Sequence, residues 1–374
     1  GASISAYGAA VAIFLSDIYH FDSVWFTTHV HLFGATSTFD FGLRQLIAVG
    51  VIVLFTIVNC AGVVLGGRVQ TFLTTAKVLS VLAVAAGVFL FSSGAEWGNL
   101  AGSGGSNGGF SGFGAPLFAA LWAYSGWQFL PMAASEVQRP EHNLPRAIVG
   151  GTVLVLAVYL LINLAYLYAL PFWEVSSANS TAYPEAPSVA AKAVQTFLGS
   201  RAVAVAALIF LVSCVGALNG TILTRARVPY AAARDGLFFE PFGRLDARTR
   251  TPIISLVLVG GWATLLAASG TFDQLTNMAV MSYAVFWIPV ALSVVVLRRK
   301  LPDAPRPYRV WGYPYVPLAF ALVMVWIVLS ALLARPGESA ATLVLILLGL
   351  PAYPLFRRRR EPGLSADALP PSAR

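Results

Sequence analysis

Residues 147–170 read AIVGGTVLVLAVYLLINLAYLYAL, a stretch without a charged side chain. A helix needs about 20 apolar residues to cross the hydrocarbon core of a membrane, so this stretch is long enough to span it. Pro, Gly and polar clusters separate it from further candidate spans, which are residues 1–19, 43–64, 71–91, 115–135, 202–223, 252–269, 277–297, 315–334 and 340–356. Strands of membrane barrels are about 10 residues long and alternate in polarity, so strands are not expected here. The sequence predicts an all-α polytopic membrane protein with about ten segments.

The composition of the chain excludes a water-soluble protein. Of its 374 residues, 57% are hydrophobic and 11% are charged, and the mean hydropathy is +0.75. A soluble globular domain carries roughly 25% charged residues. The low charge content excludes soluble enzymes and disordered chains. The pI of 9.7 does not indicate a nucleic-acid binder, because the basic residues lie in short clusters between apolar runs. We expect a transmembrane domain over residues 1–356 and a disordered cytoplasmic tail over residues 357–374.

The basic residues divide unequally between the two sets of loops. Of 24 Lys and Arg residues, 19 belong to the loops after the second, fourth, sixth, eighth and tenth segments, and 4 belong to the opposite set. Lys and Arg accumulate in cytoplasmic loops. We therefore expect a multi-pass protein of the cell membrane with a cytoplasmic C-terminus. Residues 224–251 would then be cytoplasmic, and residues 92–114 and 171–201 would face outside.

Lys77 is the one basic residue left over from this division, and it lies inside a span. It follows Arg68, at the expected cytoplasmic edge, by nine residues, which is roughly 13 Å of helix and close to the middle of a core about 30 Å thick. A charge at that depth costs about 2.5–3.5 kcal/mol. One interpretation is a side chain that extends to the membrane interface. The other is a fixed positive charge facing the bundle interior, where a transporter would otherwise bind Na⁺.

Ser125-Gly126 falls at the centre of the segment over residues 115–135, between aromatic residues. Glycine lowers helix stability, and serine can bond to its own backbone. A helix unwound here would free backbone groups at mid-membrane, which is tolerated only where they line a cavity. The alternative is a close contact between packed helices, for which small residues are equally suited.

Two further polar positions lie at or near the spans. Asn219 lies among small residues that suit helix packing, and its amide is expected to form an interhelical hydrogen bond. Glu136 ends the segment over residues 115–135 and belongs either to a solvated turn or to a gate or proton site. The sequence contains no metalloprotease, nucleophile-elbow or phosphate-binding motif. We therefore expect no enzyme activity, no cofactor and no metal.

Several stretches together carry a family pattern. They are Val58-Asn59-Cys60, Arg68-Val69-Gln70, Ala76-Lys77, Ala123-Tyr124-Ser125-Gly126-Trp127, Asn143-Leu144-Pro145, Ser213-Cys214-Val215-Gly216, Asn219-Gly220, Arg234-Asp235-Gly236 and Leu297-Arg298-Arg299-Lys300. Their combination resembles the amino acid–polyamine–organocation (APC) superfamily, and within it the L-type amino acid transporter branch and its bacterial relatives. The similarity covers nearly the whole chain.

The resemblance implies an inverted-repeat (LeuT-like) transporter fold of twelve helices, ten of which repeat as two sets of five. The segments found here match helices three to twelve, and residues 115–297 match the complete second repeat. The chain would then be incomplete at its N-terminus, without the glycine-rich break that binds the substrate carboxylate in this family. We expect the intact gene to encode two more spans before Gly1, and residues 1–374 alone to show no saturable amino acid uptake.

The resemblance also assigns roles to residues. The substrate site would comprise Trp122, Ala123, Tyr124, Ser125, Gly126 and Trp127. Carbonyls near Trp122 and Ser125 would accept the ammonium group of an amino acid. Lys77 would replace a sodium ion and reach Ser213.

The sequence departs from the family pattern at positions that bear on the partner subunit and on the substrate pocket. Residues 20–43 contain no cysteine, whereas animal members carry one that bonds a heavy-chain subunit, so we expect no disulfide-linked heavy chain. Phe286 stands where some members have a polar residue in the tenth helix, and Ser125 stands where relatives often have Gly or Asp. We take Phe286, Asn219 and Glu136 as further gate or pocket candidates.

These expectations lead to a secondary-active, sodium-independent amino acid exchanger that works by alternating access in the lipid bilayer. A proton-coupled symporter of the same fold is the near alternative. Outside this class, a transporter-like sensor would bind an amino acid without moving it. An intramembrane enzyme would need a catalytic pair in the spans, and Asp17, Lys77 and Glu136 lie far apart in the expected topology.

Overall fold

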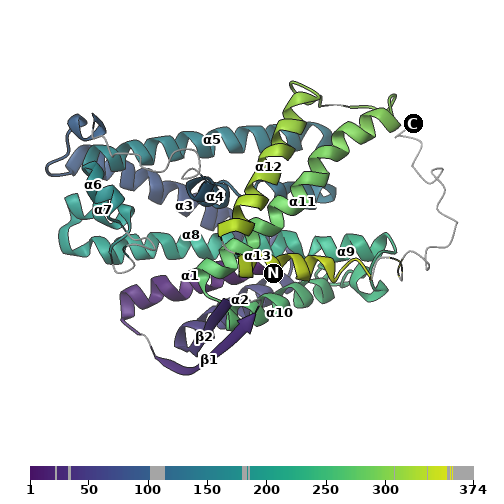
Figure 1. Ribbon diagram of the computed structural model, residues 1–374, viewed down its shortest axis with the longest axis horizontal. Coiled ribbons are helices and arrows are strands. Elements are labelled where there is room, and N and C mark those ends of the chain that lie inside the picture. The colour runs from purple at the N-terminus through teal and green to yellow at the C-terminus, as the bar shows by residue number, and fades with distance from the viewer. Residues whose placement is uncertain are drawn as a thin grey trace.

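Figure 1 shows a computed structural model of the chain, which describes residues 1–21, 23–32, 35–101, 114–178, 183, 186–306, 308–334, 336–351, 354 and 356. The helices that match the predicted spans are α1 (Ala2–Tyr19), α2 (Leu43–Cys60), α3 (Val63–Phe91), α4 (Gly114–Ala123), α5 (Pro140–Ala169), α8 (Ala202–Arg225), α10 (Ile253–Ser269), α11 (Phe272–Lys300), α12 (Tyr315–Ala334) and α13 (Pro336–Leu347). Within the described residues, seven helical stretches are long and apolar enough to cross a membrane. The predicted polytopic helical architecture is confirmed.

The boundary between the second and third spans differs from the prediction. α2 ends at Cys60 and α3 already begins at Val63, so Arg68 lies inside a helix rather than in a loop. The short connection contains Gly62, whose φ of 147° suits glycine. Gly66 and Gly67 lie between the predicted spans 43–64 and 71–91, and both are helical.

An antiparallel hairpin joins α1 to α2 where no strand was expected. β1 (Val24–Leu32) pairs with β2 (Ala35–Gly42), and Thr28 lies opposite Phe39. Both strands are rich in β-branched and aromatic residues, which favour strands. The hairpin projects from one edge of the helical bundle (Figure 1), so it lies outside the helical spans.

Short helices occupy the other connections. They are α6 (Phe172–Ser176), α7 (Val189–Leu198), α9 (Arg227–Arg234), η1 (Trp97–Ala101), η3 (Trp127–Glu136), η4 (Gly199–Arg201) and η5 (Glu240–Gly243). α7 begins after Ser188, whose hydroxyl accepts a hydrogen bond from the N–H of Ala191 at 3.2 Å, a typical N-cap. The tail over residues 357–374 lies outside the described residues.

α1 lies among the other helices and packs against α2, α8, α10 and α11. Their shared core contains Ile4, Ile52, Leu218 and Ile222. α3 contacts both α5 and α8, and the three run side by side along the long axis of the molecule (Figure 1). α11 and α12 form a pair that crosses them, and both contact α4. Elements from both halves of the chain therefore surround the segment in which Ser125-Gly126 lies.

Candidate functional site

The segment that begins with α4 is interrupted in its middle. α4 ends at Ala123, residues 124–126 form a turn, and the chain continues as the 3₁₀ helix η3. Gly126 has φ 134° and ψ −34°, a combination that residues with a side chain rarely adopt. Pro131 within η3 lacks a backbone N–H, which further weakens helical bonding. The break therefore lies at Ser125-Gly126, where the sequence predicted it.

The break leaves two backbone carbonyls, those of Tyr124 and Ser125, without a hydrogen-bond donor in the described part of the chain. The Ser125 N–H donates to the carbonyl of Trp122 at 3.0 Å, and the Tyr159 hydroxyl donates to the carbonyl of Ala123 at 2.9 Å. A carbonyl at membrane depth requires a partner or a water-filled cavity. The carbonyl of Trp122 is already bonded, and a role of the carbonyls near Trp122 and Ser125 as acceptors for an ammonium group stays a prediction.

Aromatic rings from two other helices stand beside the break. The ring of Trp122 lies 5.3 Å from the ring of Tyr7 in α1, centroid to centroid. The ring of Trp127 lies 5.4 Å from that of Trp287 in α11. The Tyr7 side chain also lies near the Ser125 side chain. Trp122 and Trp127 thus provide apolar surfaces on the two sides of the break.

Arg225, at the C-terminal end of α8, adds a cation to this aromatic group. Its guanidinium lies 4.8 Å from the ring centroid of Phe129 and 5.1 Å from that of Tyr283, and it donates to the Tyr283 hydroxyl at 2.5 Å. Tyr283 stacks on Trp287 at 5.6 Å. Sequence reasoning missed Arg225 and Tyr283, because their contacts join distant segments. The available signal was the spacing of Tyr283 and Trp287, four residues apart on one helix face.

Small residues set the register between α3 and α8, which run antiparallel. Gln70 faces Gly220, where an added Cβ would lie 3.0 Å from the Gln70 amide oxygen. Leu73 faces Gly216, where an added Cβ would lie 3.2 Å from the Leu73 Cβ. Residues further along α3 therefore pair with residues about equally far back along α8.

The same register brings Lys77 to Ser213, about one helical turn beyond Leu73. Lys77 also lies near Cys214, the residue after Ser213. The Lys77 side chain is half-buried and has no hydrogen-bond or ion-pair partner among the described residues. Lys77 therefore lies on the side of α3 that faces α8, and its direct bond to Ser213 stays a prediction.

Asn219 of α8 connects three helices and is fully buried. Asn59 of α2 donates from Nδ2 to Asn219 Oδ1 at 2.9 Å, and Asn219 donates from Nδ2 to Gln70 Oε1 of α3 at 3.0 Å. The interhelical hydrogen bond expected for Asn219 is present. These contacts place Asn219 in helix packing, and its role as a gate or pocket residue stays a prediction.

Replacing Asn219 with leucine is expected to lower the free energy of unfolding by about 1–2 kcal/mol, because the fully buried Asn59 amide loses its partner. Thermal unfolding of the detergent-solubilised protein measures the change. Asn163→Leu is the control, since Asn163 is exposed on α5 and, among the described residues, its side chain bonds only to Tyr159 of its own helix. Equal losses in the two variants would contradict the role of the network.

The structure does not bring Phe286 to the break. Phe286 is 56% exposed and lines a cleft between α1, α10, α11 and α13, whereas the next residue, Trp287, contacts Trp127. Successive side chains of a helix point about 100° apart, so neighbours in sequence face different surroundings. The side chain of Glu136 lies outside the part of the chain that the structure describes.

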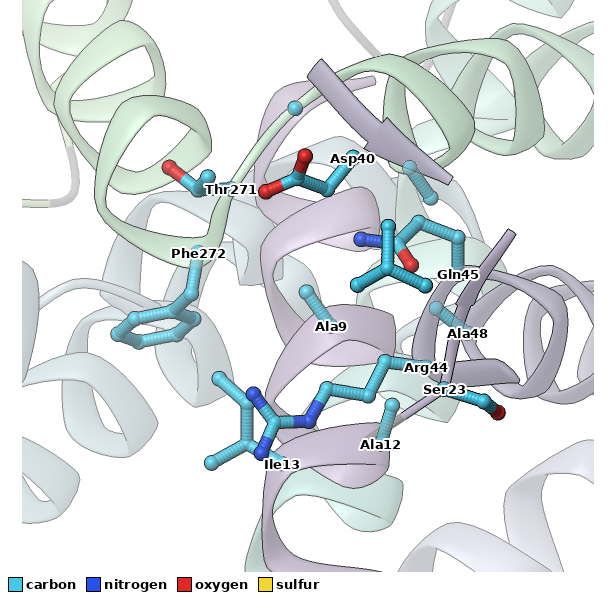
Figure 2. Close-up of a pocket in the computed structure, with 13 residues that line it drawn as sticks. Ala9, Ala12, Ile13, Ser23, Asp40, Arg44, Gln45, Ala48, Thr271 and Phe272 are labelled. Carbon is cyan, nitrogen blue, oxygen red and sulfur yellow. The ribbon is translucent and has the colours of Figure 1, made fainter. Parts of the chain in front are cut away.

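A separate cavity of about 200 Å³ lies at the hairpin end of α1 and α2 (Figure 2). Its lining includes Ala9, Ala12, Ile13, Gln45, Ala48 and Phe272. Asp40 and Arg44 contribute the charged side chains, and the Thr27 hydroxyl donates to the Asp40 carboxylate at 2.8 Å. No residue of the break lines this cavity, so it is distinct from the predicted substrate site.

Known proteins are similar in sequence to this chain along most of its length. The sequence profile of the amino acid permease family matches residues 2–350. The chain is 29% identical over 322 residues to the serine/threonine exchanger SteT of Bacillus subtilis (strain 168), which covers 85% of this chain and 71% of that protein. It is 28% identical over 322 residues to the cystine/glutamate transporter of Homo sapiens, with 85% and 61% covered. It is 29% identical over 322 residues to the b(0,+)-type amino acid transporter 1 of Mus musculus, with 83% and 62% covered.

The matched region spans between 61% and 71% of the length of these relatives. The profile match covers all the helices from α1 to α13. The apolar helices and the interrupted segment at Ser125-Gly126 agree with a membrane transporter. The chain belongs to the amino acid permease family.

Proposed function

We propose that this protein is a sodium-independent amino acid exchanger that works by alternating access. The helix break at Ser125-Gly126 carries the proposal, because the carbonyls of Tyr124 and Ser125 suit the ammonium group of an amino acid. The rings of Trp122 and Trp127 offer apolar walls to the remainder of the substrate. The relatives named above are transporters rather than enzymes, and one of them is named an exchanger, which supports exchange as the mode of transport.

Lys77 supports sodium independence. Lys77 lies on the side of α3 that faces α8, and its side chain is half-buried. A fixed positive charge at this contact supplies what a bound sodium ion would otherwise bring. The helices α4 with η3, α5, α8, α10 and α11 make up the proposed second repeat over residues 115–297.

Exchange is tested with the full-length protein in liposomes. Preloading the liposomes with unlabelled amino acid is expected to raise the uptake of labelled amino acid several-fold, equally in sodium and choline buffers. An amino acid-induced proton flux, read with a pH-sensitive dye, would favour a symporter instead. Saturable binding without such counterflow would favour a sensor.

We also propose a cell-membrane protein with a cytoplasmic C-terminus, because the basic residues gather on one side of the spans. A single cysteine in place of Arg248, in the exposed loop between α9 and α10, is expected to resist a membrane-impermeant thiol reagent in intact cells. A cysteine in place of the exposed Glu96 is expected to react. Both substitutions are made in a protein without Cys60 and Cys214. Labelling at position 248 in intact cells would contradict the proposed topology.

The cysteines bear on the expected partners. Cys60 in α2 and Cys214 in α8 are half-buried within helices, and the sequence of the hairpin connection has no cysteine. A covalent bridge to a heavy-chain subunit would need an accessible thiol outside the bundle. We therefore expect the protein to run without a disulfide-linked partner on non-reducing gels.

A further inference from the structure

Gln128 lies in the first turn of η3 and is 9% exposed. Its side chain folds back over the break, where its Oε1 accepts the N–H of Gly126 at 2.8 Å. The side-chain amide therefore stabilises the turn that separates α4 from η3. Sequence reasoning passed over this residue, because a single glutamine in an apolar run carries no spacing signal.

The hydrogen bond from Gly126 fixes which way the Gln128 amide is turned. A backbone N–H requires an acceptor, so the oxygen must face Gly126 and the NH₂ group must face away from it. Both atoms belong to one planar amide, so Nε2 also lies beside the break. Nε2 is buried and has no hydrogen-bond acceptor among the described residues.

The break thus offers groups of both kinds. Two carbonyls, those of Tyr124 and Ser125, lack a donor in the described part of the chain, and one buried amide donor lacks an acceptor. Buried polar groups in proteins are nearly always paired, so the unpaired buried Nε2 beside these two carbonyls points to a ligand site. One neutral NH₂ group is a poor partner for a buried carboxylate but a suitable one for a hydroxyl or amide oxygen.

We propose that Gln128 determines specificity by donating a hydrogen bond from Nε2 to an oxygen on the side chain of the bound amino acid. This inference rests on the proposed function, with the substrate ammonium held by the carbonyls of Tyr124 and Ser125. Amino acids with an oxygen-bearing side chain are then favoured over aliphatic ones of the same shape, because an aliphatic side chain leaves the buried donor unpaired.

Threonine and valine test the proposal, since they have nearly the same shape and differ in a hydroxyl and a methyl group. The full-length wild-type protein is expected to favour threonine by about 10- to 100-fold in competition for exchange. Gln128→Glu keeps an oxygen for the Gly126 N–H and removes the NH₂ donor. Gln128→Met removes both at similar length. The threonine preference is expected to fall to near unity in both variants.

A purely structural role of Gln128 gives a different pattern. Gln128→Glu would then keep the threonine preference, and Gln128→Met would lower exchange of threonine and valine equally; either result overturns the proposal. Gln138→Glu makes the same chemical change at an exposed position beyond η3 and is expected to leave the preference unchanged.

Ligand-induced thermal stabilisation in detergent separates this proposal from the proposed function. Threonine is expected to stabilise the wild-type protein at a concentration about 10- to 100-fold lower than valine. Stronger stabilisation by threonine without any exchange would overturn the exchanger and leave the role of Gln128 standing. Exchange with equal stabilisation by threonine and valine would overturn the role of Gln128. If the protein shows no exchange and is stabilised by neither amino acid, both the exchanger and the role of Gln128 are overturned.

Discussion

Replacing Gly126 with alanine is expected to abolish amino acid exchange by the full-length protein. Gly126 has φ 134°, and nothing lies within 4 Å of an added Cβ, so the penalty is backbone strain rather than a clash. Such strain costs about 1–3 kcal/mol and favours a return to regular helix. A regular helix would pair the carbonyls of Tyr124 and Ser125, which are the proposed ammonium site. Counterflow in liposomes measures the loss.

Gly151→Ala is the matched control. Gly151 lies in the middle of α5, is exposed and has no atom within 4 Å of an added Cβ. Alanine there is expected to be neutral or stabilising by roughly 0.5–1 kcal/mol. Gly126→Leu should fail as Gly126→Ala does, because both share the strained φ. Normal exchange by Gly126→Ala with loss only in Gly126→Leu would assign the effect to side-chain volume and contradict an essential turn.

The spans were predictable because the thickness of a membrane imposes a length on every apolar run. The run over residues 202–223 became α8 almost to the residue. The connection between α2 and α3 was not predictable from composition, because Gly66 stays helical and makes room for Asn59 of the neighbouring helix. The hairpin was missed for another reason. Its β-branched and aromatic residues favour strands, but they lie between the apolar runs, where the thickness of the membrane sets no length.

The helix break was predictable because Ser125-Gly126 is a local signal within an apolar run. The groups that complete the site were not, since they come from other helices. Tyr159 occupies the carbonyl of Ala123, and Tyr7 approaches Trp122, across distances in sequence that no spacing rule covers. The sequence can indicate which face of a helix a residue lies on, but it does not indicate which residue of another helix that face contacts.

Replacing Lys77 with methionine is expected to reduce exchange by at least roughly 100-fold while the protein still folds. Methionine keeps much of the length and apolar stem of lysine and removes the charge. Removing a charge from the membrane core avoids a cost of about 2.5–3.5 kcal/mol, so the variant is expected to be at least as stable as the wild type. A loss of exchange without a loss of stability would show that the charge at the contact of α3 and α8 serves transport. Thermal unfolding and counterflow on the same preparation measure both quantities.

Thr75→Met is the control for Lys77→Met, because Thr75 lies on the exposed face of α3 and has no hydrogen-bond partner among the described residues. Exchange by that variant should match the wild type.

Wild-type exchange should be the same in sodium and in choline, since the positive charge at the contact with α8 is covalently fixed and needs no ion from solution. A clear sodium requirement in the wild type, or full exchange by Lys77→Met, would remove Lys77 from the coupling mechanism. An unstable Lys77→Met protein would instead assign the half-buried lysine side chain a structural role at the contact of α3 and α8.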